Sequence, residues 1–401
     1  MRLTSVLRQI NYHRHFKRVW ARQGKLQAPE LVIPPELIEM KVEIKDGKSF
    51  LKETQGLKKS ASIKVIPKPP CVFEKKKVTY LMHNKTKVSE SENQILALTK
   101  TVCYRGLPEQ LTGLLNAESF PNQDELVQKS VLQAQVWDAT QDKLPKVVDV
   151  TRPGLPQRRV YGIRYKKKVS SLLENLSVLC DIATGKYPGS LERFKLTECS
   201  SELTIDRCGD QVIFQLPCEI AMTSTSPLKR FSSKDEVNET VNLEVPSIYP
   251  IKPTLDLEQL EQSSLERSGV PIVLDSDHLH TLFLGQKSFG YWNPRQMLAK
   301  AIGTCFAYTA SVAQDKYGLD VKVLPEPIMV QCMYLDIKTF NFLTYQLNTL
   351  ELADNNGIKN QVWVDEPADL YESVSQDSLV TNYNPAVFPK MLALHMNGLH
   401  P

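Results

Sequence analysis

The sequence predicts an α+β fold, in which helices and an antiparallel sheet or meander form one large globular body behind an extended basic N-terminal arm. Three observations indicate this class: alternating apolar runs within 327–364, a long capped helix at 293–317, and a basic front interrupted by prolines. The 401 residues are 42% hydrophobic and 23% charged, which is typical of a globular chain long enough to bury a large core.

Residues 327–364 are predicted to form a β-meander. Apolar residues rich in β-branched and aromatic types recur with a period of two along 328–334 and 340–347. The connection between these two runs has the length of a hairpin loop, and a third apolar strand is predicted over 361–364. Since one helix covers only one face of such a hairpin, the other face or the 340–350 edge is expected to contact a protein partner.

A helix is predicted over 293–317. Asn293 suits the N-cap, Pro294 suits the first turn, and Gly318 stands just past the end. The apolar residues between them form one stripe, and small residues within it would allow close approach to a sheet. Because this helix leads directly into the meander, the two are expected to form the main core of an α+β body spanning 201–401.

The region 89–200 is predicted to be mainly helical. Helix starts are expected at Ser91, at Pro108 and at Asn122, and a further helix is expected around 172–179. Later in the chain, two strands are predicted around the turn at Gly209, and a last helix over 388–396.

Charge is unevenly distributed. Residues 1–90 hold 20 Lys and Arg against 8 Asp and Glu, a net charge of +12. The remaining residues hold 29 bases against 37 acids, a net charge of −8. A basic front on an acidic body indicates that the front meets an anionic partner.

Residues 1–27 have the composition of a mitochondrial presequence. Bases alternate with apolar residues, and no acid occurs before Glu30. Import into the mitochondrial matrix and cleavage between Trp20 and Glu30 are therefore expected, the alternative being an RNA-binding arm that the mature protein retains. Residues 28–88 follow as an extended Pro/Lys-rich basic arm, which would lie along phosphates or serve as a solvated linker.

The most basic internal segment is 145–170, with eight Lys and Arg against one Asp. Cations for phosphates and aromatic rings for unpaired bases are what contact with structured RNA requires. Prolines and a glycine predict an irregular surface segment here, and the alternative is a solvated face. The predicted RNA-binding residues of the arm and this segment are Lys75, Lys76, Lys77, Arg158, Arg159, Tyr161, Arg164, Tyr165, Lys166, Lys167 and Lys168.

The sequence predicts no catalytic, metal-binding or cofactor-binding site. The eight cysteines are scattered without a Cys-x-x-Cys pair, which argues against a thiolate zinc site and a disulfide framework. Asp275–His280 is the one cluster that suggests a metal, and an enzyme using it remains a rival hypothesis. No apolar run is long enough to span a bilayer, and no small-molecule substrate is predicted.

A family resemblance is carried by sequence blocks that occur in one order along residues 90–400: ILALTKTVCYRGLPEQL, PNQDEL, IYPIKPTLDL, KVLPEPIMVQ, FNFLTYQLNTLEL, NNGIKNQVWVDE and FPKMLALHMNG. They resemble the mitochondrial large ribosomal subunit protein 37 family. The YQLNTL block is also similar to the paralogous mitochondrial ribosomal family once described as a programmed-cell-death protein. Residues 28–88 and 220–245 depart from the first family's pattern.

This resemblance implies a structural component of the mitochondrial large ribosomal subunit without known catalysis. It also implies contacts with large-subunit rRNA and with other mitochondrial ribosomal proteins, including the paralogue as a heterodimer partner. The alternative function is a mitochondrial RNA-binding or translation-activating factor outside the ribosome.

Overall fold

The computed structural model describes residues 35–41, 78–135, 144, 161–260, 278–285, 292–374 and 379–399. The chain divides into two units, Met1–Glu74 and Lys75–Pro401. In the first unit, one short exposed helix is described, α2 (Pro35–Glu39). The predicted presequence and most of the predicted arm lie outside the described residues.

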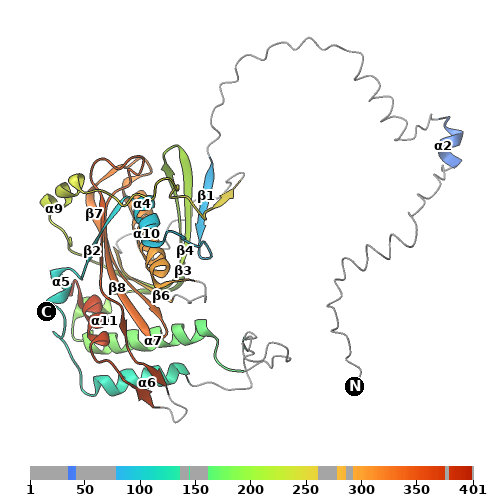
Figure 1. Cartoon of the computed structure of the whole chain (residues 1–401). Helices are drawn as coiled ribbons and strands as arrows, with labels where there is room; N and C mark the ends of the chain where they lie inside the picture. Colours follow the sequence, from blue (N-terminus) through green and yellow to red (C-terminus); the bar gives the residue numbers. More distant parts are fainter. Residues whose placement is uncertain are drawn as a thin grey trace, which may run out of the picture. The chain divides into compact units, whose positions relative to one another are not determined.

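A mixed sheet is the centre of the second unit (Figure 1). Its described strands run in the order β2-β9-β8-β7-β6-β4-β1-β5, with β10 paired to β8 and β3 paired to β4. Their bounds are β1 (Thr79–His83), β2 (Thr101–Arg105), β3 (Lys195–Arg207), β4 (Asp210–Ser224), β5 (Glu258–Leu260), β6 (His278–Gly285), β7 (Val323–Asp336), β8 (Thr339–Thr349), β9 (Asn360–Val364) and β10 (Ala368–Asp369). A separate ribbon pairs β11 (Ser373–Val374) with β12 (Val380–Thr381).

The predicted α+β class is confirmed, and so is the meander, because β7, β8 and β9 pair antiparallel in sequence. The β7–β8 turn is tighter than predicted. Asp336 pairs with Thr339, so the turn itself is Ile337–Lys338, and Ile337 takes a φ of +38°. The sheet also contains three parallel pairs, β1–β4, β2–β9 and β6–β7, which the sequence did not predict.

Helix α10 (Pro294–Tyr317) confirms the predicted long helix and its caps. The Asn293 side chain accepts a hydrogen bond from the N–H of Gln296 at 2.8 Å, and the Gln296 side chain accepts one from the N–H of Asn293. Gly318 ends the helix with a φ of +89°, which suits glycine. The helix is buried almost all round rather than along one stripe, because α4 (Ser91–Thr99) packs against it in addition to the strands of the sheet.

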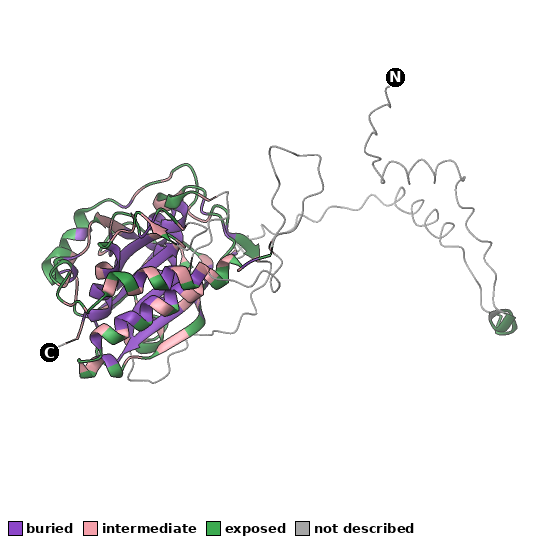
Figure 2. Ribbon diagram, turned by 90° about the horizontal axis from the view of Figure 1, so that it is seen from below, coloured by how far each residue is buried: buried purple, intermediate pink, exposed green. Residues whose placement is uncertain are grey.

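The opposite face of the sheet is covered as well. Four helices pack there, namely α5 (Glu109–Thr112), α6 (Gln123–Gln135), α7 (Tyr165–Thr184) and α11 (Val387–Met396). Phe342, which points to this face, has an exposed fraction of 0%. The prediction that a bare face or the 340–350 edge of the meander contacts a partner is therefore wrong, because helices cover the face and β7 and β9 flank β8. In Figure 2, the central strands are buried and the covering helices are exposed on their outer sides.

Where the helices on this face of the sheet end, the side chains of β8 form a buried polar network. It lies under the segment that carries α9 (Lys234–Glu239) and η1 (Thr240–Asn242). Gln346 accepts hydrogen bonds from the N–H groups of Phe231 and Ser232, at 3.0 and 3.1 Å, and donates to Asn348. The polar residues of the YQLNTL block thus join a loop to the sheet, which explains their burial without a ligand.

Candidate functional site

The structure describes part of the predicted RNA-binding set. Lys75–Lys77, Arg158 and Arg159 lie outside the described residues, whereas Tyr161 and 164–168 lie within them. Tyr165 to Lys168 form the first turn of α7 instead of the predicted irregular segment. The prolines that suggested irregularity all precede Tyr161, so nothing prevents a helix from starting at Tyr165.

Several of these side chains have partners within the protein. Lys166 pairs with Glu198 at 2.7 Å, and Lys168 donates to the side-chain oxygen of Gln135 at 2.8 Å. Tyr165 donates its hydroxyl hydrogen to Asp336, which holds its ring against the β7–β8 turn. Arg164 and Lys167 are exposed and directed to the surface. The structure therefore shows Tyr165, Lys166 and Lys168 in contacts that hold α7 in place, with Lys167 on the exposed side of the same turn.

The charge at the start of α7 is unusual. Lys166, Lys167 and Lys168 occupy the first turn, which contains no acid. The N-terminus of a helix carries a partial positive charge from its free N–H groups, so three cations there repel it. Such an arrangement is favourable when an anion binds beside it.

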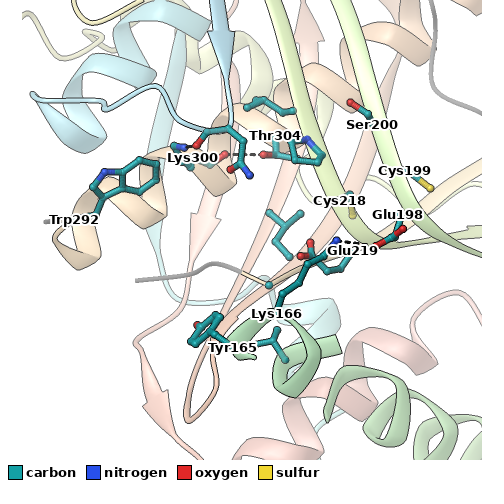
Figure 3. Close-up of a pocket in the computed structure, with 16 residues that line it drawn as sticks. Tyr165, Lys166, Glu198, Cys199, Ser200, Cys218, Glu219, Trp292, Lys300 and Thr304 are labelled. Atoms are coloured by element: carbon teal, nitrogen blue, oxygen red, sulfur yellow. Dashed lines mark hydrogen bonds and ion pairs between the residues drawn. The ribbon is translucent and has the colours of Figure 1, made fainter. Parts of the chain in front are cut away.

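A cavity of about 450 Å³ lies next to this turn (Figure 3). It forms where two neighbours of β4 end. Strand β1 pairs with β4 as far as His83, which lies opposite Gln215. Strand β6 pairs with β4 from Ile220 onward, where Ile220 lies opposite Phe283. The stretch of β4 between them, 216–219, borders the cavity together with the start of α7 and the first turns of α10.

Lys300 extends from α10 into this cavity. Its ammonium group donates to the backbone carbonyl of Asn84 and lies 3.7 Å from the centre of the Trp292 ring. Burial lowers the pKa of Lys300 to about 7. Figure 3 shows Lys300 and Trp292 together at one end of the cavity, away from Lys166 and Tyr165.

Acidic groups stand at the other end. Glu219 accepts a hydrogen bond from the N–H of Gly285, and its burial raises its pKa. Glu198 has a φ of +53°, which is rare for a non-glycine residue within a strand. Its carboxylate pairs with Lys166 at the rim, and this ion pair lowers the pKa of Glu198. Burial at this cavity thus disfavours the charged form of one amine, Lys300, and of one carboxyl group, Glu219.

His280, part of the cluster that suggested a metal, has both ring nitrogens in hydrogen-bonding contacts. Nδ1 is 2.8 Å from the Thr281 hydroxyl, and Nε2 is 2.8 Å from the carbonyl oxygen of Asn397. The carboxylates Asp275 and Asp277 lie outside the described residues. Within the described part of the chain, no group of three or more His, Cys, Asp and Glu could hold a metal ion.

The sequence did not indicate the cavity residues Lys300, Trp292, Glu198 and Glu219. One signal was available, because Lys300 falls among the buried positions of a helix that is otherwise apolar and small. A buried lysine in such a setting indicates either backbone partners or a functional amine.

Known proteins are similar to most of this chain. Large ribosomal subunit protein mL37 of Gallus gallus is 29% identical over 343 residues, covering 81% of this chain and 76% of the relative. The mL37 proteins of Bos taurus and Rattus norvegicus are 29% and 28% identical, with the same coverage. The resemblance to the protein 37 family is confirmed. Residues 294–398 also match the family model for mitochondrial 28S ribosomal protein S30 (PDCD9).

The names of the mL37 relatives and of the family model refer to different ribosomal subunits. The family model covers the stretch from α10 to α11, whereas the similarity to mL37 covers 81% of the chain. The mL37 proteins therefore account for far more of the sequence. No helix in the described ranges has the length and apolar composition needed to cross a membrane.

Proposed function

We propose that this protein is a structural constituent of the mitochondrial large ribosomal subunit in the matrix, with no catalytic role of its own. The observation that carries the proposal is the similarity to mL37 over 81% of the chain. The described structure is consistent with it, because most polar groups in the buried face of the sheet bind one another or the backbone. Such a body supports assembly through its surface.

Co-sedimentation tests this proposal directly. The tagged protein, expressed in mitochondria, is expected to migrate with the large subunit on a sucrose gradient at moderate salt. The rival function, a free RNA-binding or translation-activating factor, requires most of the protein to remain near the top of the gradient while still binding RNA in a salt-sensitive way. That second outcome would exclude the ribosomal role.

The first turn of α7 is the described part of the proposed rRNA contact. Arg164 and Lys167 are exposed, and the helix N-terminus adds N–H donors beside them. A phosphate at this point would neutralise the repulsion among the lysines and the helix dipole. Contacts of this kind fix position and register but do not read sequence.

Lys167→Glu separates this contact from folding. The substitution places an acid at a helix N-terminus, so the free energy of unfolding is expected to rise by about 0.3–1 kcal/mol. Incorporation into the large subunit should nevertheless fall, and more steeply as salt increases, because a phosphate contact is lost. Lys129→Glu makes the same charge change on an exposed position of α6 and is expected to leave incorporation unchanged.

Two results would contradict the contact. One is equal incorporation of the Lys167→Glu and Lys129→Glu variants at every salt concentration. The other is crosslinking of assembled subunits that finds no rRNA near 145–170.

The proposed protein partner is the paralogue, bound as a heterodimer. Helices cover the sheet faces, so this partner would meet outer helix surfaces or the sheet rim. Strand β2 is one rim, and beside it Trp363 stacks on Tyr104 with ring centres 5.4 Å apart. Trp363→Ala should weaken co-purification of the paralogue, whereas an unchanged yield of the pair would place the contact elsewhere.

A further inference from the structure

Three described lysines are almost fully buried, and their ammonium groups have different numbers of acceptors. Lys359 donates to the carbonyls of Thr240, Val241 and Gly357, at 2.9 to 3.2 Å. Lys100 donates to two carbonyls and lies 3.6 Å from a carboxylate oxygen of Asp354. Since an ammonium group carries three N–H donors, both lysines are well satisfied in the charged form.

Lys300 differs from these two lysines. Its exposed fraction is 5%, and within the described ranges it has one hydrogen-bond acceptor, the carbonyl of Asn84. Among the residues that the structure describes, no carboxylate lies within 4.0 Å of its nitrogen; the other neighbour is the Trp292 ring. The carbonyl and the ring face can take the two N–H groups of an uncharged amine, which then keeps its lone pair.

The other titratable groups at the cavity do not supply the missing charge. Lys166 and Glu198 pair with each other at the rim, and Tyr165 is bound to Asp336. Burial raises the pKa of Glu219 and of the thiols of Cys199 and Cys218, so their neutral forms are favoured too. Lys300, whose pKa is lowered to about 7, is thus largely an uncharged amine at the slightly alkaline end of neutral pH.

We propose that Lys300 is a nucleophilic amine that accepts short acyl groups from thioesters entering this cavity. The lone pair of Nζ attacks the thioester carbonyl, an N–C bond forms, the C–S bond breaks, and the thiol leaves with the proton released by the amine. No electron is transferred, and no co-reactant is needed beyond the thioester.

The product fits the same surroundings. The amide nitrogen keeps an N–H for the carbonyl of Asn84 and carries no charge, so its burial is less costly than that of an ammonium group. A cavity of about 450 Å³ has room for a short acyl chain. Because a carboxylate would lose hydration on entering this cavity, uncharged acyl groups such as acetyl are expected to react faster than acyl groups that carry a carboxylate.

The test measures acylation of every lysine in the folded full-length protein. The reagent is the acetyl thioester of N-acetylcysteamine, applied from pH 6 to pH 10, with site-resolved mass spectrometry. At pH 7.5 Lys300 is expected to react at least about tenfold faster than Lys316 or Lys390, because a far larger fraction of it is unprotonated. Those two lysines are suitable references, since each has a carboxylate partner.

The pH profile and unfolding complete the test. The rate at Lys300 should level off above about pH 7, and its advantage should disappear in concentrated urea, where the cavity no longer exists. A succinyl thioester should react more slowly than the acetyl thioester at Lys300 alone. The proposal is overturned if Lys300 reacts no faster than Lys316 in the folded protein, or if its rate keeps rising to pH 10.

Discussion

Asn360 shows how a single buried amide can join three parts of a sheet. Its side-chain oxygen accepts hydrogen bonds from the N–H groups of Asn348 and Thr349, at 2.8 and 3.0 Å, just past the last paired residues of β8 and β9. Its NH₂ group donates to the carbonyls of Thr99 and Thr349, at 3.0 and 3.1 Å. The side chain thus extends the ladder where the backbone pairing stops.

Asn360→Ala is expected to lower the free energy of unfolding by about 1–3 kcal/mol for each buried group left without a partner. Two backbone N–H groups lose their acceptor, so the variant should be among the least stable single changes in this half of the chain. Chemical denaturation measures the loss. Asn356→Ala, in the exposed turn nearby, is the control and should remain within about 0.5 kcal/mol of the wild type.

His280 and His395 make stability depend on pH. Burial, together with the nearby charge of Arg193, lowers the pKa of both rings, and it does so for His395 despite Asp181 at 3.1 Å. The unfolded chain therefore binds protons below pH 6.5 that the folded protein does not. The contribution of these two histidines to stability should be constant above that pH and fall as the pH drops from about 6.5 toward 5, by up to about 1.4 kcal/mol per pH unit for each histidine.

His280→Gln isolates one of the two histidines. Glutamine cannot be protonated in this range, so the slope of stability against pH between 5 and 6.5 should fall by the contribution of one histidine. Equal slopes for the wild type and the variant would mean that His280 binds its proton as readily in the folded protein as in the unfolded chain.

At the scale of elements, α10 lies unusually close to its neighbours. A Cβ atom on Gly303 would lie 3.1 Å from Cδ1 of Ile95 on α4 and 3.2 Å from Cε of Met82 on β1. The absence of a side chain at this position therefore permits the packing of helix, helix and strand together.

Gly303→Val is expected to destabilise the protein by about 1–3 kcal/mol, because the added isopropyl group overpacks this contact. Lys316→Val, at an exposed position of the same helix, tests the cost of a β-branched residue alone and should be nearly neutral. A Gly303→Val variant as stable as Lys316→Val would show that Ile95 and Met82 can move aside.

The elements that the sequence predicted well are those with local signals. The caps of α10, with Asn293 before the helix and Gly318 after it, and the alternation along β7 and β8 need no distant information. Strands β1 and β2 were missed because each is five residues long and pairs in parallel with a strand more than 100 residues away. The cavity was missed for the same reason, since it exists only where β1 and β6 end beside β4.

The helices over the second face show a related limit. All four were expected, near Pro108, near Asn122, around 172–179 and over 388–396, but periodicity does not say which face of which sheet a helix covers. Phe342 illustrates the result, since it was a possible interface residue by sequence and is fully buried in the structure. The charge of residues 164–168 identified them as a basic patch, but the sequence did not predict that most of them form the first turn of a helix.

At the scale of the molecule, the described core residues lie between Tyr80 and Met396. The one helix described in the first unit, α2, is exposed. A chain of residues 75–401 is therefore expected to melt at the same temperature as the chain of residues 28–401, within about 2 °C, since every described core residue is kept. Calorimetry measures this directly.

The same truncation should still matter in assembly. Removal of residues 28–74 takes away much of the basic front, so incorporation into the large subunit should become weaker and less sensitive to salt. Loss of several degrees in melting temperature would show instead that the front packs on the body. Unchanged incorporation would show that the front is a linker.

The three carbonyls around the ammonium group of Lys359 have a practical consequence. The exposed turn at 353–357 is the kind of site that proteases attack, and Lys359 lies two residues after it. A trypsin-like protease must take the lysine side chain into its own pocket, and that of Lys359 is 1% exposed. Digestion after this residue therefore requires the loop to open first, so the appearance of a fragment ending at Lys359 reports how often the folded protein opens there.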